Sequence, residues 1–140
     1  EMFKKIERIL YKAFAAMKIE YGAVHPEFRI ASDGKIYFME IATRMGGDCI
    51  GTDLTPLSSG YDFMGMVINI CCGKVPDFTK VGKPKIAEIH YIMCQEDLIK
   101  FENLKKENPE IIWRFSKMRS INETPILKSA DRAGYYIIKK

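Results

Sequence analysis

The sequence predicts an α+β fold, in which an antiparallel or mixed sheet is flanked by helices. Apolar residues recur with helical spacing over residues 2–18, two alternating segments flank Asp33-Gly34, and a strand–helix–strand pattern follows residue 84. With 140 residues, 47% of them hydrophobic, the chain is long enough to bury a core. We expect two parts, residues 1–83 and a closing α+β lobe over residues 84–140 that packs on the first.

The first predicted element is an amphipathic helix over residues 2–18. Its apolar side chains are three or four positions apart, and charged side chains separate them. A surface helix with one face on the core is much commoner than a helix lying on a membrane, and we expect the former. The apolar face comprises Phe3, Ile6, Leu10, Phe14 and Met17.

A β-hairpin is predicted next, with strands over residues 23–31 and 35–42. Asp33-Gly34 is a strong signal for a two-residue hairpin loop. Such a loop places Glu27 directly opposite Glu40, with both side chains on one face of the hairpin. In this register one face holds His25, Glu27, Arg29, Phe38, Glu40 and Ala42, and the other holds Val24, Phe28, Ile30, Tyr37, Met39 and Ile41.

The rest of the chain alternates loops, helices and strands. Residues 43–59 are rich in Gly, Thr, Ser and Pro and predict a long loop with room for a short helix. A helix over residues 61–72 should end at Gly73. Downstream, the pattern predicts a strand at 85–93, a helix at 96–106, and further strands at 111–117, near Ile126 and at 134–139.

Composition narrows the class of protein. The net charge of +4 is spread along the chain without the basic stripe of a nucleic-acid binder, so we expect no nucleic-acid partner. The sequence has neither a signal peptide nor an apolar run long enough to cross a membrane, and we expect a cytoplasmic protein without a membrane partner. Cys49, Cys71, Cys72 and Cys94 lack metal-site spacing and are interpreted as free thiols.

Two opposed carboxylates repel each other, so something must offset the charge of Glu27 and Glu40. The two acids could share a proton, form an ion pair with Arg29, or bind a divalent cation such as Mg²⁺. Arg44 follows the second strand, and its planar guanidinium suits a phosphate or carboxylate, although a surface ion pair with Asp48 or Asp53 is the plainer interpretation. Gly46-Gly47 permits close approach of backbone N–H groups to an anion.

These segments resemble the C-terminal part of an ATP-grasp ligase. The resemblance lies in G-A-V-H-P-E-F-R (22–29), F-M-E-I-A-T-R-M-G-G-D (38–48) and T-P-L-S-S-G-Y-D (55–62), and more weakly in D-R-A-G-Y-Y-I (131–137). It implies that Glu27 and Glu40 bind the two Mg²⁺ ions (or Mn²⁺) that hold the ATP phosphates. It also implies that Arg44 is catalytic and holds phosphate or acyl-phosphate. Gly46, Gly47 and His25 are the further candidate contacts to phosphate or substrate.

One departure concerns the second metal. Most relatives read E-x-N-P-R, whereas this chain has Ala42 and Thr43 in place of Asn and Pro. The E-x-A-x-R form resembles L-amino-acid ligases; carbamoyl-phosphate-synthase-like relatives normally keep the Asn. The resemblance therefore implies an ATP-dependent carboxylate–amine or related ligase that works through an acyl-phosphate, with ATP, a small acid and an amine as substrates.

The sequence lacks the glycine-rich loop and the nucleotide-binding lysines of that family. It also opens on Glu1 inside a helical pattern. We therefore expect a piece of a longer protein that needs the family's N-terminal lobes and is inactive alone. The alternative function is a non-catalytic interaction domain that kept the ATP-grasp-like fold, with its acids merely paired to Arg29.

Overall fold

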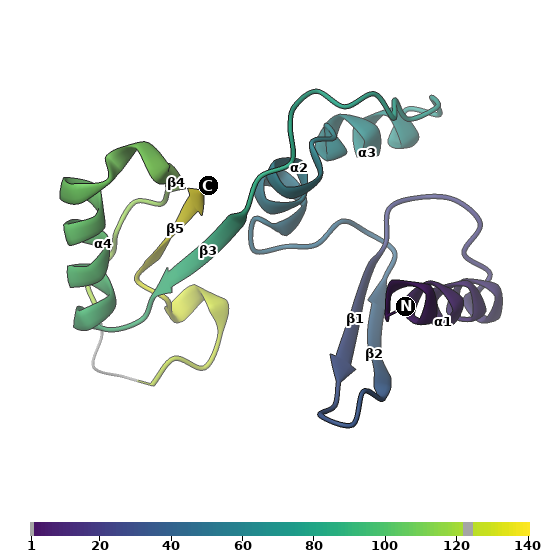
Figure 1. The fold of residues 1–140 in the computed structure, drawn as a ribbon, viewed down its shortest axis with the longest axis horizontal. Coiled ribbons are helices and arrows are strands. Elements are labelled where there is room, and N and C mark those ends of the chain that lie inside the picture. Colours follow the sequence, from purple (N-terminus) through teal and green to yellow (C-terminus); the bar gives the residue numbers. More distant parts are fainter. Residues whose placement is uncertain (1, 122–124) are drawn as a thin grey trace. The chain divides into compact units, whose positions relative to one another are not determined.

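The computed structural model describes residues 2–121 and 125–140. The chain forms two compact units (Figure 1). The first comprises Glu1–Thr52 and Asp62–Phe78, and the second comprises Asp53–Tyr61 and Thr79–Lys140. The predicted α+β class is confirmed, and the division into lobes at residue 83 stays a prediction.

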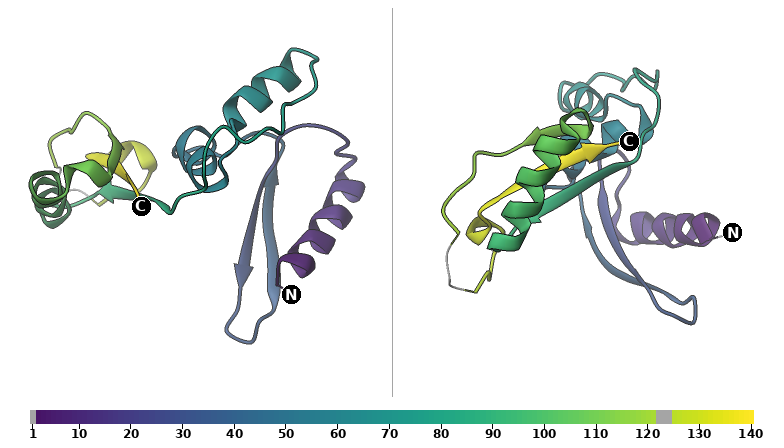
Figure 2. Two further views of the ribbon diagram at one scale, coloured as in Figure 1. Left: turned by 45° about the horizontal axis from the view of Figure 1, so that its top comes forward. Right: turned by 60° about the vertical axis from the view of Figure 1, so that its left-hand side comes forward.

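The first unit contains the predicted N-terminal helix and hairpin. Helix α1 spans Met2–Met17, strand β1 spans His25–Ile30, and strand β2 spans Ile36–Ala42 (Figure 2). No residue of α1 is buried, and the Phe3 and Met17 side chains are 87% and 51% exposed. The periodicity thus predicted the helix correctly but overstated how much of its apolar face is covered.

The hairpin loop has three residues, Ser32, Asp33 and Gly34, so the predicted two-residue loop is wrong. The N–H of Ala31 donates to the carbonyl of Lys35 at 2.9 Å, and the N–H of Gly34 donates back to the carbonyl of Ala31 at 2.9 Å. Gly34 has φ +78°, the left-handed conformation that ends this class of three-residue loop. The Asp33 carboxylate accepts the Lys35 N–H at 3.0 Å, and its pairing with the Lys35 side chain lowers the pKa of Asp33.

A β-bulge in β2 compensates for the extra loop residue. Phe28 pairs with Phe38, whereas the preceding residue of β1, Glu27, pairs with Glu40, so Met39 is the bulged residue. One additional residue in the loop and one in the strand leave Glu27 opposite Glu40. The predicted pairing of the two acids is therefore confirmed, although the register between the bulge and the loop differs from the predicted one by one residue.

The long segment after β2 contains more helix than the sequence predicted. It holds a π-helical turn, η1 (Ile50–Leu54), followed at once by α2 (Thr55–Ser59). Helix α3 then spans Phe63–Cys71, and Asp62 caps it by accepting the Gly65 N–H at 2.9 Å. Gly73, at φ +70°, follows the end of α3 as predicted.

The second unit is built on an antiparallel sheet with the order β3-β5-β4. Its strands are β3 (Ala87–Ile92), β4 (Ile112–Phe115) and β5 (Gly134–Lys139); α4 (Gln95–Glu107) and the 3₁₀ turns η2 (Pro109–Ile111) and η3 (Ser129–Asp131) join them. Phe101 of α4 is 1% exposed and stacks on Tyr136 of β5 with ring centroids 4.9 Å apart. Burial raises the pKa of Tyr136. Ile92, Ala133 and Ile138 complete this core cluster.

The predicted strand near Ile126 is wrong, because this residue lies in an irregular segment that leads into η3. Pro125 precedes it and has no N–H to donate to a sheet. The following N–H groups of Leu127 and Lys128 both donate to Asp131 Oδ2, at 3.1 Å each. A local carboxylate thus takes the donors that a strand would use.

Candidate metal and phosphate site

The two acids of the hairpin lie side by side at its open end, away from the loop. Glu27 pairs directly with Glu40, and because directly opposed side chains project to the same side, both carboxylates share one face. Both residues are exposed. His25 lies one step further along the same face of β1, with its Nε2 3.4 Å from Glu27 Oε1. Glu27 thus has Glu40 opposite it across the hairpin and His25 in contact along β1.

Arg29 does not neutralise this pair. Within residues 2–121 and 125–140, Arg29 forms no ion pair with Glu27 or Glu40. It stands opposite Tyr37 instead of Phe38, because the bulge shifts the register of β2 by one residue. The predicted faces are therefore wrong for this end of the hairpin: Tyr37 joins the carboxylate face, and Phe38 packs edge-on against Phe28 on the other face, with ring centroids 5.3 Å apart.

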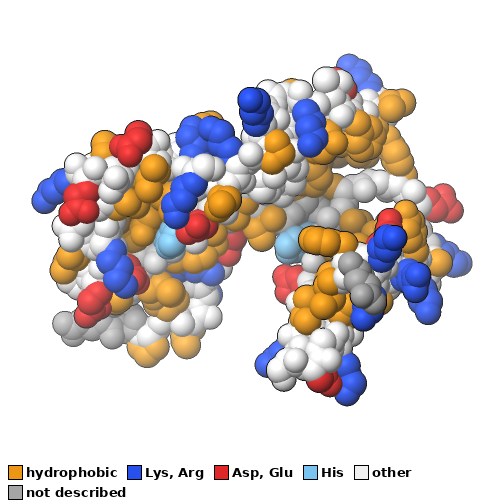
Figure 3. All heavy atoms as spheres, viewed as in Figure 1, with side chains coloured by type: hydrophobic (Ala, Val, Ile, Leu, Met, Phe, Trp, Pro, Cys, Tyr) orange, Lys and Arg blue, Asp and Glu red, His pale blue; other side chains and the backbone are white. Residues whose placement is uncertain are grey.

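An open cavity of about 410 Å³ lies on the hairpin and is lined by Arg29, Ala31, Tyr37 and Met39. The Tyr37 and Met39 side chains are 51% and 62% exposed. Hydrophobic side chains also gather on the visible surface over the hairpin (Figure 3). The face that carries the two acids thus combines carboxylates near its open end with an arginine and apolar contact surface toward the loop.

Arg44 follows β2 directly and remains exposed. Its Nη1 donates to the carbonyl of Met45 at 3.0 Å. This bond uses one of the five N–H donors of the guanidinium. Asp53, considered above as a partner of Arg44, is instead buried and accepts from Trp113 Nε1 at 3.2 Å and Arg114 Nη1 at 3.1 Å. Sequence reasoning missed this pairing because about 60 residues separate its members.

Gly46 and Gly47 differ in how much space surrounds them. A Cβ on Gly46 would lie 2.9 Å from His25 Nδ1 and 3.0 Å from Ile50, so only glycine lets His25 pack here. A Cβ on Gly47 would meet nothing within 4 Å. The next two residues, Asp48 and Cys49, have φ values of 48° and 62°, which are unusual for residues with side chains. The backbone therefore adopts a left-handed conformation at the two residues that follow the glycine pair.

The protein side chains at this site could supply only some of the ligands that Mg²⁺ needs. Among the described residues, no three or more His, Cys, Asp and Glu side chains are grouped so that they could hold a metal ion. Two carboxylates suit Mg²⁺ because this ion prefers oxygen ligands and usually keeps waters or substrate phosphates as its remaining ligands. The metal and phosphate roles of Glu27, Glu40, Arg44, Gly46, Gly47 and His25 stay predictions.

No helix in the described part of the chain combines the length and the apolar character needed to cross a membrane.

Comparisons with known proteins bear on the fold. No family profile and no curated protein sequence matches the chain. Among the solved structures that match, two align over 99% of the chain: L-amino acid ligase from Bacillus licheniformis (TM-score 0.74, 19% identity) and phosphoribosylglycinamide synthetase from Anaerococcus prevotii (TM-score 0.75, 17% identity). The chain spans 36% and 37% of the lengths of these two ATP-grasp enzymes. It therefore has the fold of the C-terminal portion of an ATP-grasp enzyme.

Proposed function

We propose that this chain forms the metal- and phosphate-binding part of an ATP-dependent carboxylate–amine ligase. The observation that carries the proposal is the direct opposition of Glu27 and Glu40 on one exposed face of a hairpin, in a chain with the fold of ATP-grasp enzymes. Opposed carboxylates destabilise a sheet unless a cation offsets their charge. Arg29 forms no ion pair with them, and His25 contacts only Glu27, at 3.4 Å, so a divalent cation is the partner that could offset both charges at once.

In this proposal Glu27 and Glu40 would hold Mg²⁺, an ion that usually takes its remaining ligands from phosphate oxygens and water. When bound, Mg²⁺ would offset the negative charge of the ATP phosphates. Arg44 and the N–H groups near Gly46 and Gly47 contact the transferred phosphoryl group, which suits an exposed guanidinium whose only described bond is to Met45. His25 lies against Gly46 and beside Glu27, where it can hold a carboxylate in place or contact substrate.

The reaction needs no side-chain nucleophile. The substrate carboxylate attacks the γ-phosphorus of ATP, an acyl-phosphate forms and ADP leaves. An amine then attacks the acyl carbon, and inorganic phosphate leaves as the new C–N bond forms. Phosphoryl transfer depends chiefly on positioning and on charge stabilisation, which Mg²⁺ held by Glu27 and Glu40, together with the Arg44 guanidinium, would supply. The adenine site, the acid site and the amine site would lie largely outside this chain.

A paramagnetic ion tests the metal site directly. We expect Mn²⁺ added to the ¹⁵N-labelled chain to broaden the amide signals around Glu27 and Glu40 most strongly. Glu27→Gln and Glu40→Gln should each weaken the ion's affinity by about tenfold or more, because each removes a direct ligand. Glu102→Gln, an exposed carboxylate on α4, is the matched control and should change nothing. Broadening centred elsewhere, or unchanged in both variants, would reject the proposed site.

A further inference from the structure

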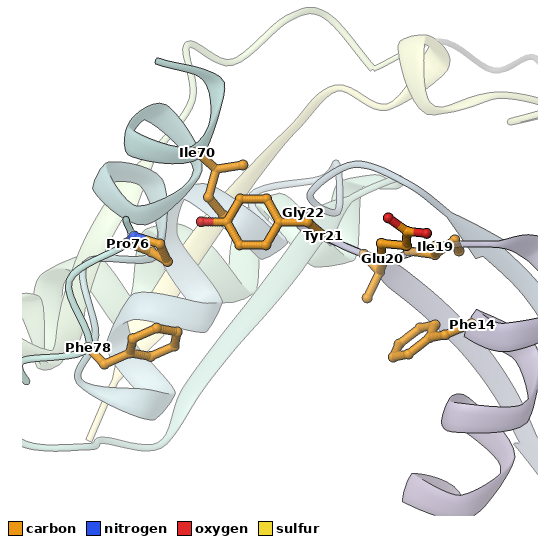
Figure 4. Close-up of a pocket in the computed structure, with 9 residues that line it drawn as sticks. Phe14, Ile19, Glu20, Tyr21, Gly22, Ile70, Pro76 and Phe78 are labelled. Carbon is orange, nitrogen blue, oxygen red and sulfur yellow. The ribbon is translucent and has the colours of Figure 1, made fainter. Parts of the chain in front are cut away.

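We propose that the first unit carries a second small-molecule site, which binds a compact organic cation with an apolar body, such as a quaternary ammonium. A cavity of about 280 Å³ lies where α1 ends, beside the segment that leads into β1 and the residues that follow α3 (Figure 4). It shares no lining residue with the group formed by Glu27, Glu40 and Arg44. This inference therefore does not depend on the proposed ligase function.

Three aromatic rings line this cavity: Phe14 from α1, Tyr21 from the α1–β1 segment and Phe78 from the segment after α3. In Figure 4 the rings of Phe14 and Phe78 point into the same space from opposite sides. The Tyr21 and Phe78 side chains are 65% and 67% exposed, so the protein leaves much of their ring surface uncovered. The face of an aromatic ring attracts a cation, and several rings around one space form the usual site for quaternary ammonium groups.

The charge of the lining favours the same ligand. Glu20 is among the lining residues, whereas no lysine or arginine is. Within residues 2–121 and 125–140, Glu20 forms no ion pair with another side chain. A carboxylate at the edge of such a cavity attracts a cation and disfavours an anion.

The remaining walls distinguish an organic cation from a metal ion. Ile19, Val24, Ile70 and Pro76 contribute apolar surface, which cannot replace the oxygen ligands that hard metal ions need. The cavity lies just below the usual size range of pockets for drug-sized ligands, so its ligand should be small. An alkylated ammonium meets both conditions, because its charge is surrounded by methyl or methylene groups.

A pair of isosteric ligands tests the proposal. The chain is titrated with choline and with 3,3-dimethyl-1-butanol, the uncharged carbon isostere of choline, while the ring signals of Phe14, Tyr21 and Phe78 are followed by NMR. We expect choline to shift all three sets of ring signals and the isostere to bind about fivefold or more weakly. Glu20→Gln should weaken choline binding about two- to fivefold without affecting the isostere, since cation contacts at exposed sites are modest.

Two kinds of variant complete the design. Tyr21→Leu and Phe78→Leu keep apolar volume but remove a ring, and each should weaken choline more than the isostere; both residues are exposed, so the amide spectrum should stay folded. Glu7→Gln, an exposed carboxylate on α1 outside the lining, should bind choline as the unchanged chain does. Equal binding of the two ligands, or no ring shift with choline, overturns the proposal. Ring shifts that depend on protein concentration alone would assign the cavity to a second copy of the chain, and would overturn it as well.

Discussion

Glu27 lies directly opposite Glu40, although the loop that joins their strands is one residue longer than a two-residue reversal. The extra loop residue alone would move Glu40 to the other face of the hairpin, because side chains alternate along a strand. The bulge at Met39 adds a second residue and restores the alignment. Two irregularities that cancel thus keep two like charges together.

The repulsion between these two acids should be measurable. We expect Glu40→Gln to raise the free energy of unfolding of the first unit in the absence of divalent cations by about 0.5 kcal/mol, because it removes one of two opposed charges. Added Mg²⁺ should stabilise the unchanged chain clearly more than the variant, in which the ion binds about tenfold or more weakly. Denaturant unfolding with and without Mg²⁺, followed by the amide signals of β1 and β2, measures both effects. Equal stabilisation by Mg²⁺ in both proteins would contradict the expectation.

The glycine pair offers a matched comparison. Gly46→Ala should destabilise the first unit by about 1–3 kcal/mol, since its Cβ would crowd His25 and Ile50. Gly47→Ala meets open space and should change stability by less than about 0.5 kcal/mol. Thermal unfolding of the two variants gives the comparison, and the chemical shift of the His25 ring shows whether it has moved. A loss of stability confined to Gly47→Ala would be inconsistent with the packing described here.

Asp53 should be important for the second unit. It is 6% exposed and accepts from both Trp113 and Arg114, so Asp53→Ala leaves these donors without that acceptor. We expect a loss of about 1.5–3 kcal/mol, the range for hydrogen bonds to charged groups. Trp113 is the only tryptophan of the chain, so its fluorescence reports unfolding at this contact directly. Glu102→Gln serves as the surface control, and a loss as small as in that control would show that the contact contributes little.

The start of α4 should make stability dependent on pH. The Asp97 carboxylate accepts the Met93 N–H at 3.1 Å, and this bond holds the pKa of Asp97 below its usual value. A carboxylate whose pKa is lower in the folded chain stabilises the fold above its unfolded pKa, and this contribution is lost as the pH falls below about 4.

The test compares denaturant unfolding of the second unit at pH 7 and pH 3. Asp97→Asn should cost about 1 kcal/mol at pH 7, because it replaces a charged acceptor of the Met93 N–H with a neutral one, and should cost less at pH 3. A penalty that is the same at both values of pH would assign the effect to packing instead of charge.

The chain by itself should be catalytically inactive. It carries the proposed metal and phosphate side chains but spans about a third of the length of the two ligases that share its fold. We expect MgATP to bind more weakly than micromolar in isothermal titration, and no phosphate release with a pool of amino acids. Micromolar binding or steady turnover by the 140-residue chain would show that the portions of those ligases without a counterpart in this sequence are not needed.

Much of the local structure could be predicted from residue patterns. The helix at Met2–Met17, the strands around Asp33-Gly34 and the helix at Gln95–Glu107 follow from periodicities of 3.6 and 2, which each segment carries within itself. The opposition of Glu27 and Glu40 also followed from counting along the chain. The three-residue loop and the bulge at Met39 that produce this pairing could not be predicted, because loop length and bulge position depend on how both faces of the hairpin pack.

Only the tertiary structure decided which distant residues meet. It placed Arg114 on Asp53, packed His25 against Gly46, and brought Phe14, Tyr21 and Phe78 to one cavity. It also left Arg29 apart from the two acids, although their separation in the sequence allowed a pair. The physical reason is that periodicity reflects the geometry of a single helix or strand, whereas contacts between segments depend on the close packing of side chains from several of them.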